Sequence, residues 1–321
     1  MASDIADVDT PQSPRDRSRA QNTARASTLA RAGDWSRRAP LLPALIFVII
    51  LTQLPFVATI VVSFMNWNAY YPDERGFAGF DNFARVFTDS NTRNAVIVTI
   101  VLTVLVVGIS LVLGMLIALL LDRKFLGRGI VRTLMITPFL VVPVAAALLW
   151  KHALYNPEYG LLNGTLKAVL GEDAPQPDWI SNNPLLSIVA ALVWQWTPFM
   201  MLILLAGLQS RPLDVVEAAR IDGASAWQIF TTMTLPHMRQ YIELSGLLGA
   251  IYVVQNFDHV FTITSGGLGT ANLPYFIYQT FYTAQDYGRA SAAGVVVVIG
   301  TILIATAALR TAFSLFKEEA R

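Results

Sequence analysis

The sequence contains no cysteine and no Gly-Lys dipeptide, and it has few charged residues. Without cysteine, disulfides, thiolate catalysis and cysteine-ligated metal sites are excluded. A P-loop holds nucleotide phosphates with a glycine-rich turn followed by Gly-Lys, so this chain has no P-loop. Charged residues make up 14% and hydrophobic residues 54% of the 321 positions, against roughly 25% and 45–50% in soluble domains. This composition indicates an integral membrane protein, and the net charge of +1 gives no indication of nucleic-acid binding.

Residues with catalytic chemistry are scattered. The three histidines, His152, His237 and His259, fall near the boundaries of apolar runs and are too far apart in sequence to indicate a metal site. The carboxylates do not converge in one segment, as a membrane enzyme would require. We therefore predict no catalytic residue, no metal site and no cofactor on this chain.

The long apolar runs predict the fold. A membrane helix needs roughly 20 apolar residues, and six runs qualify. We expect an all-α integral membrane protein with six transmembrane helices in a domain over residues 41–316. Residues 1–40 are too polar to fold alone and predict a disordered cytoplasmic tail, and residues 317–321 form a cytoplasmic C-terminus. The six runs are approximately 41–65, 95–121, 131–150, 185–208, 241–263 and 291–313.

The distribution of lysine and arginine predicts the orientation. If the N-terminal tail is inside, 17 of the 23 Lys and Arg residues lie on the cytoplasmic side. The positive-inside rule favours this topology. Both termini and the stretch 210–239 are then cytoplasmic.

The stretch 210–239 lies between two apolar runs but is rich in charge. Burying those charges in hydrocarbon would cost several kcal/mol each, so we place the stretch in water. Pro212 suits a first helical turn and Gly223 a helix end, which predicts a helix over 212–222. A second helix is expected from Ala224 to Thr234, stopped by Leu235-Pro236. Because such short helices are marginal in water, the pair needs a surface on which to dock.

The same stretch resembles a known motif. Glu217-Ala218-Ala219, Gly223, Met233 and Leu235-Pro236 have the spacing of the EAA loop in permease subunits of bacterial binding-protein-dependent ABC importers, with Met233 in place of the family's isoleucine. The resemblance implies a type I ABC importer permease fold with a cytoplasmic coupling helix that docks on an ATP-binding subunit. The residues that it assigns to this coupling are Glu217, Ala218, Ala219, Asp222, Gly223, Leu235 and Pro236.

Other segments resemble the carbohydrate-uptake, maltose permease-like branch of this family. They are Gly79–Phe83, Tyr159–Asn163, Thr264–Gly267 with Leu268 replacing a proline, Tyr275–Tyr278 and Tyr287–Ala290. The runs Asn66–Pro72 and Leu148–Tyr155 more specifically resemble sorbitol and mannitol permeases. A sugar or polyol importer is therefore the function that the resemblance implies.

That function requires several partners. The resemblance implies a second permease subunit in a heterodimer, two ATP-binding subunits that hold ATP and Mg, and an extracytoplasmic solute-binding protein. The location would be the bacterial plasma (inner) membrane. The chain itself is then a transport subunit and not an enzyme.

A hydroxyl-rich solute needs polar side chains and aromatic faces along the path. An alignment with the related maltose permease, anchored on Glu217 and Pro236, assigns solute contacts to seven positions, although Val253 stands where that relative is polar. For Asn256, a role in tying helices together is an equal alternative. The seven positions are Gln195, Trp196, Phe199, Gly249, Tyr252, Val253 and Asn256.

The main alternative is an ion-coupled secondary transporter of a small neutral solute. Such a carrier normally has ionisable residues deep in several spans and inverted internal repeats. The sequence shows neither clearly, so a subunit driven by a separate ATPase is the preferred interpretation.

Overall fold

The computed structural model describes residues 39–318, without the side chains of Leu213 and of most of the last helix after Leu303. The described chain is mostly helical, in agreement with the predicted all-α class. All but two residues of the predicted tail 1–40, and residues 319–321 of the predicted C-terminus, lie outside the described residues. The chain divides into two compact units, Met1–Ala58 and Thr59–Arg321.

The first unit is described from Ala39 onward. It consists of the 3-10 turn η1 (Ala39–Leu41) and most of helix α2 (Leu42–Ser63), whose last turn belongs to the second unit. Over its first 17 residues α2 carries only Thr52 and Gln53 as polar side chains, and the Thr52 hydroxyl donates back to the Val48 carbonyl. This helix therefore has the composition of a membrane span.

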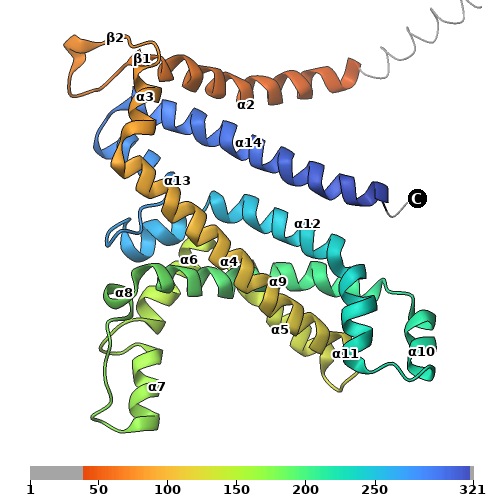
Figure 1. Cartoon of the computed structure of the whole chain (residues 1–321). Helices are drawn as coiled ribbons and strands as arrows, with labels where there is room; N and C mark the ends of the chain where they lie inside the picture. Colours follow the sequence, from red (N-terminus) through yellow and green to blue (C-terminus); the bar gives the residue numbers. More distant parts are fainter. Residues whose placement is uncertain (1–38, 319–321) are drawn as a thin grey trace, which may run out of the picture. The chain divides into compact units, whose positions relative to one another are not determined.

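The second unit contains every other element (Figure 1). In chain order these are β1 (Met65–Asn66), η2 (Pro72–Glu74), β2 (Gly76–Phe77), α3 (Asp81–Thr88), α4 (Ser90–Asp122), α5 (Arg128–Leu140), α6 (Pro143–Leu148), η3 (Leu149–Leu154), α7 (Leu161–Leu170), α8 (Trp179–Asn182), α9 (Pro184–Gln209), α10 (Leu213–Ile221), α11 (Ala226–Ile229), η4 (Phe230–Thr234), α12 (Leu235–Val254), η5 (Val260–Thr264), α13 (Leu273–Tyr278), η6 (Gln279–Thr283) and α14 (Tyr287–Glu318). Strands β1 and β2 pair antiparallel as a small hairpin.

Within residues 39–318, three helices are long and apolar enough to cross a membrane: α2, α4 and α9. They match the predicted runs 41–65, 95–121 and 185–208. The predicted run 131–150 is not one straight helix, because α5 and the α6–η3 segment meet at an angle of 96°. If this bent pair is one broken span, the described chain holds four candidates.

The bend has a local cause. Pro143 lacks an N–H and disfavours helical backbone at the residue before it. Val141 and Val142 are accordingly extended, with ψ of 133° and 134°. Pro143 then occupies the first turn of α6, where a missing N–H costs no helical bond.

The predicted run 241–263 is also interrupted. Helix α12 starts earlier, at Leu235, and ends at Val254. Residues 255–257 are not helical, and the chain resumes as the π-helical turn η5. The polar residues Gln255 and Asn256 therefore lie in a helix break.

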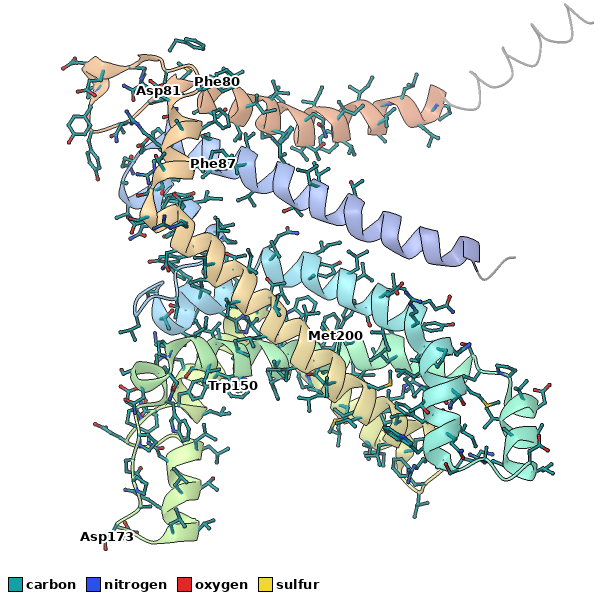
Figure 2. All side chains as sticks on the ribbon, in the orientation of Figure 1. Phe80, Asp81, Phe87, Trp150, Asp173 and Met200 are labelled. Atoms are coloured by element: carbon teal, nitrogen blue, oxygen red, sulfur yellow. The ribbon has the colours of Figure 1, made fainter. Side chains whose placement is uncertain are left out.

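Helix α9 is the centre of the second unit. Two clusters of buried apolar side chains lie along it, both formed with residues of α4 and α12 and one of them also with η5. Gly114 of α4 allows close approach, because a Cβ there would lie 3.1 Å from the Met201 backbone nitrogen. Figure 2 shows Met200 where α4 crosses α9. In the apolar window of each helix, 67% of the residues of α9 are buried but only 28% of those of α4.

Both ends of α4 carry an aspartate that is paired with an arginine from a later part of the chain. At its first turn, Asp89 accepts hydrogen bonds from the backbone and hydroxyl of Thr92 and pairs with Arg289 of α14 at 2.5 Å. Burial raises the pKa of Asp89, but the Thr92 hydrogen bonds and the Arg289 charge outweigh it and hold the pKa below its ordinary value. At the last turn, Asp122 pairs with Arg211 at 2.6 Å.

The motif residues away from the 210–239 stretch tie loops together. Asn82 is buried and donates its amide to the carbonyls of Ser63 and Met65. Gly288 lies against the same carbonyl of Met65, where a Cβ would clash. Asn163 similarly joins α7 to the loop after it, through Pro177 and the Trp179 indole. These elements have a structural role in the second unit.

Candidate functional site

Helix α10 begins and ends one residue inside the predicted bounds 212–222. Its C-terminus is a Schellman motif: the N–H of Ala224 donates to the Ala219 carbonyl, and the N–H of Gly223 to the Arg220 carbonyl. Gly223 has φ of +87°, the left-handed conformation that favours glycine. The role predicted for Gly223 as the turn that closes this helix is confirmed.

The second helix of the stretch differs from its prediction. It starts at Ala226 behind a capping box, in which Ser225 and Gln228 exchange side-chain to backbone hydrogen bonds. Leu235-Pro236 does not stop it, because α11 continues through η4 directly into α12. Pro236 is accommodated by the wider π-helical turn, in which the Leu235 N–H donates to the Phe230 carbonyl five residues back.

Arg211 fixes the start of the loop. Its guanidinium donates to three groups from different elements: Asp122 at the end of α4 (2.6 Å), the Leu208 carbonyl at the end of α9 (2.9 Å) and the Thr234 hydroxyl at the end of η4 (2.9 Å). The Arg211 side chain is only 14% exposed. Arg211, two residues before α10, is therefore bonded to the ends of α4, α9 and η4.

A second network lies beside this arginine. The Ser210 hydroxyl is 2.8 Å from the Tyr241 hydroxyl and 3.1 Å from Nε2 of His237. Gly207 lies under the Tyr241 ring, which leaves no room for a Cβ at position 207. The end of α9 and the start of α12 are thus held together by hydrogen bonds and by close packing.

The face that α10 presents to solvent is apolar with a charged rim. Ile221 of α10 is 86% exposed, and Trp227 of the following helix α11 is 71% exposed. Ala218 and Glu217 are exposed, whereas Ala219 is buried and turned towards the protein. Large exposed apolar side chains on a short water-facing helix indicate a docking surface. Of the predicted coupling residues, Asp222, Gly223, Leu235 and Pro236 are exposed as well.

Three of the predicted solute-contact residues form an aromatic wall. Trp196 and Tyr252 stack with ring centroids 5.3 Å apart, and Phe199 contacts both rings edge-on. Phe139 of α5, which the sequence did not single out, stacks on Phe199 at 5.3 Å. Tyr252 is 54% exposed. The aromatic wall, Phe139, Trp196, Phe199 and Tyr252, offers ring faces of the kind that bind the apolar face of a sugar ring.

The structure places other predicted contacts behind this wall. Gln195 is buried, and its amide donates to the Val141 carbonyl at the α5–α6 bend, 2.9 Å away. Gly249 and Val253 are buried on α12, and Gly249 lies against the Met200 side chain. These three residues pack inside the protein, and their contact with a solute stays a prediction.

Asn256 lies in the helix break beside a buried histidine. Its amide nitrogen is 3.2 Å from Nδ1 of His259, and its backbone carbonyl accepts a bond from Asn272. The Asn256 Oδ1 and His259 Nε2 atoms are buried and make no hydrogen bond with the described residues. The break therefore holds one acceptor and one ring nitrogen that a water or a solute hydroxyl could satisfy. His259 was not among the predicted site residues, because a lone histidine has no local pattern.

A groove on another side of α9 differs from the aromatic wall in the side chains that line it. It has a volume of about 650 Å³, lies between α4, α5 and α9, and is lined by apolar side chains such as Ile109, Leu134 and Val189. The Thr197 hydroxyl is among its few polar groups and has no hydrogen-bond partner among the described residues. A hydroxyl-rich solute would lose its hydration there without replacement, so this groove is a poor solute site.

The fold and the loop together define a class: a helical membrane protein whose central helix leads into a short, exposed helix. The chain belongs to the family described as "Binding-protein-dependent transport system inner membrane component", whose model matches residues 110–314. The matched region includes α9, the 210–239 stretch and α12. Membership disfavours the alternative of an ion-coupled carrier.

Individual relatives extend the similarity over most of the chain. A protein of Sinorhizobium fredii, named as probable ABC transporter permease protein y4oQ, is 35% identical over 267 residues, 82% of this chain and 85% of that one. The trehalose/maltose transport system permease protein MalF of Thermococcus litoralis is 33% identical over 262 residues, 81% of this chain and 87% of that one. The trehalose transport system permease protein SugA of Mycobacterium tuberculosis is 32% identical over 256 residues, 79% of this chain and 81% of that one.

A solved structure supports the fold. A chain of a bacterial ABC transporter involved in the import of alginate matches with a TM-score of 0.75 and 22% identity, over 88% of this chain and 96% of that one. The protein therefore shares its arrangement of helices with that chain.

Proposed function

We propose that this chain is one of two permease subunits of a binding-protein-dependent ABC importer, which moves a sugar or polyol inward through a bacterial plasma (inner) membrane. The observation that carries the proposal is helix α10, an exposed helix held at its root by Arg211 and closed by the Gly223 turn. A chain without a P-loop lacks the ATP site that is typical of P-loop ATPases, and a docking helix is a means to receive movement from a subunit that has one.

In the proposed cycle, two ATP-binding subunits carry ATP and Mg, and one of them binds the face of α10 around Glu217, Ala218 and Ile221. When the ATP-binding subunits close, α10 moves as a rigid body. Arg211 passes the displacement to the ends of α4, α9 and η4, which rocks the spans between inward-open and outward-open arrangements. A six-span topology with both termini in the cytoplasm is part of the proposal and puts 210–239 on the side of the ATP-binding subunits.

The solute would cross beside the aromatic wall. Ring faces and a few hydrogen-bonding groups bind a neutral sugar with modest affinity, which a translocation site needs for release. Asn256 and the wall residues Trp196, Phe199 and Tyr252 are the proposed contacts. Two of the relatives described above are named for trehalose/maltose and trehalose transport, which favours a sugar as the first solute to test. The polyol assignment rests on the resemblance of residues 66–72 and 148–155 alone.

The test is purification of the chain with the subunits encoded beside it, followed by ATPase measurement in nanodiscs. A panel of sugars and polyols is added with and without the solute-binding protein. We expect hydrolysis to rise several-fold only when a solute and its binding protein are both present. If the chain alone accumulates solute in vesicles, or if no binding protein stimulates hydrolysis, the proposal is wrong.

Glu217→Arg provides the specific variant. Charge reversal on the exposed face of α10 should reduce co-purification of the ATP-binding subunits about tenfold, a loss of roughly 1.4 kcal/mol. Glu158→Arg, a charge reversal in the loop before α7, is the control and should retain them. Equal loss in both variants would assign the effect to charge in general and not to docking by α10.

A further inference from the structure

The loop between α4 and α5 is short and strongly basic. It runs from Arg123 to Gly127, where Gly127 adopts φ of +83° and leads into α5. Four basic residues lie in the ten positions 123–132, namely Arg123, Lys124, Arg128 and Arg132. None of their side chains forms an ion pair or hydrogen bond with the described residues.

The nearest carboxylate in sequence does not neutralise them. Asp122, the last residue of α4, is bonded to Arg211. The segment 123–132, which comprises the loop and the first turns of α5, therefore keeps four positive charges without a counter-charge from its chain neighbours. A concentration of unpaired cations in one short segment attracts a phosphate or carboxylate from outside the described chain.

The segment 123–132 also exposes large apolar side chains. Leu126 is fully exposed, Ile130 is 68% exposed and Phe125 is 39% exposed. An acidic protein surface or a free anion would satisfy the cations but would leave these side chains in water. The boundary of a bilayer satisfies both, because cations meet the headgroups while apolar side chains enter the acyl region.

The spacing of the arginines fits a phosphate group. Arg128 and Arg132 are one helical turn apart on α5, so both guanidinium groups lie on one face of the helix. Planar guanidinium groups bind phosphate oxygens in pairs. Met135 follows on the same face in the next turn and is exposed, which continues the face as an apolar surface for an acyl chain.

We propose that the loop 123–132 binds the headgroup of an anionic phospholipid. Arg128 and Arg132 hold the phosphate, Arg123 and Lys124 add to the positive field, and Leu126 and Ile130 insert beside the acyl chains. Binding would fix the ends of α4 and α5 at the membrane surface, next to the Asp122–Arg211 pair. The proposal does not depend on the transported solute or on the ATP-binding subunits.

The experiment uses the full-length chain, purified in detergent, and a fluorescent phosphatidylglycerol. The wild type is compared with Arg128→Gln/Arg132→Gln. Since each basic residue at a membrane surface contributes about fivefold in affinity, the double variant should bind the lipid roughly 25-fold more weakly. Fluorescent phosphatidylcholine, which has no net charge, should bind equally to both proteins.

Arg85→Gln/Arg93→Gln is the matched control, because both arginines are exposed, lack ion pairs among the described residues and lie near the other end of α4. This variant loses the same charge and should keep wild-type lipid binding. Leu126→Ser should weaken lipid binding by a smaller factor, about five, and the preference for phosphatidylglycerol over phosphatidylcholine should remain.

Three results would overturn the proposal. Equal loss in the control would mean a non-specific charge effect, and displacement of the lipid by millimolar inorganic phosphate would mean a site for free anions. An unchanged affinity in Arg128→Gln/Arg132→Gln, with reduced co-purification of an ATP-binding subunit, would assign the loop to a protein partner.

Discussion

The two ends of α4 use the same chemistry for different purposes. At one end, Asp89 is an N-terminal cap: it accepts bonds from Thr92, and its negative charge is favourable beside a helix N-terminus. At the other end, Asp122 lies at a helix C-terminus, where a negative charge is unfavourable. It is stabilised there by Arg211, which also binds α9 and η4. The first pair secures a helix end locally, and the second joins several elements at the root of the docking helix.

The two ends of α4 differ in whether they can transmit movement. Loss of the Asp89–Arg289 pair leaves the Thr92 bonds in place, so the cap partly survives. Loss of the Asp122–Arg211 pair leaves a poorly exposed charge without a partner and frees the root of α10. We therefore expect the Asp122 end to govern coupling and the Asp89 end to contribute only stability.

The largest effect is expected from Arg211→Gln. An unpaired charge in a buried pair costs 3–5 kcal/mol, and we expect about 2–3 kcal/mol here because Asp122 is 26% exposed. Solute uptake in proteoliposomes should fall at least about tenfold, while ATP hydrolysis per solute moved rises. Combining Arg211→Asp with Asp122→Arg should restore part of the uptake.

Arg239→Gln is the control for this change. It breaks the pair with Glu243 on α12, in which the arginine side chain is 60% exposed, and such pairs contribute roughly 0–1 kcal/mol. If Arg239→Gln uncouples as strongly as Arg211→Gln, the buried root of α10 has no special role.

A second test asks whether the turn after α10 must be left-handed. Gly223→Val places a β-branched residue at φ of +87°, at a cost of at least about 1–2 kcal/mol. Uptake should fall several-fold, measured in the assembled complex. Gly223→Asn, which tolerates this conformation, should keep most of the uptake, and equal defects in the two variants would contradict the conformational explanation.

A third change, Trp196→Ala, alters the aromatic wall on α9 and should affect neither the Asp89 end nor the Asp122 end of α4. Removal of one stacking face should raise the KM for uptake about five- to tenfold, by the roughly 1–1.4 kcal/mol of an aromatic contact. The ratio of ATP to solute should stay at the wild-type value. Phe87→Ala, at an exposed aromatic residue of α3, is the control, and a KM increase there would remove the aromatic wall from the solute path.

The smallest effect concerns the Asp89 end and pH. Because the folded pKa of Asp89 lies below its ordinary value of 3.8, its contribution to stability is present above pH 3.8 and is lost as the pH falls through the folded value. We expect a contribution below about 1 kcal/mol, since the pair is partly exposed. The difference in Tm between wild type and Asp89→Asn should shrink as the pH is lowered from 6 to 3. A constant difference would contradict the assignment.

The sequence predicted the features that local patterns encode. Long apolar runs located α2, α4 and α9, and Gly223 located the end of α10. The motif around Glu217 located the exposed helix α10, and the family resemblance selected three residues of the aromatic wall. Each of these signals is contained in one continuous segment of the sequence.

The features that were missed depend on distant partners. Asp122 and Arg211 are 89 positions apart, and no local pattern pairs them. Pro236 was expected to end a helix, but a π-helical turn that starts six residues earlier accommodates it. Leu268 stands where the related motif has proline and adopts φ of +53°, which a proline ring forbids, so the turn itself differs from the one expected.

The most direct test of the proposed coupling role of α10 is a chemical cross-link from this helix. Because the chain has no cysteine, Ala218→Cys introduces a single thiol on the exposed face, and Leu161→Cys on α7 introduces one at the other end of α9 (Figure 1). In the assembled complex, a thiol-to-amine cross-linker about 10 Å long should join Ala218→Cys, but not Leu161→Cys, to an ATP-binding subunit. A cross-link from Leu161→Cys alone would contradict the claim that α10 is the coupling helix.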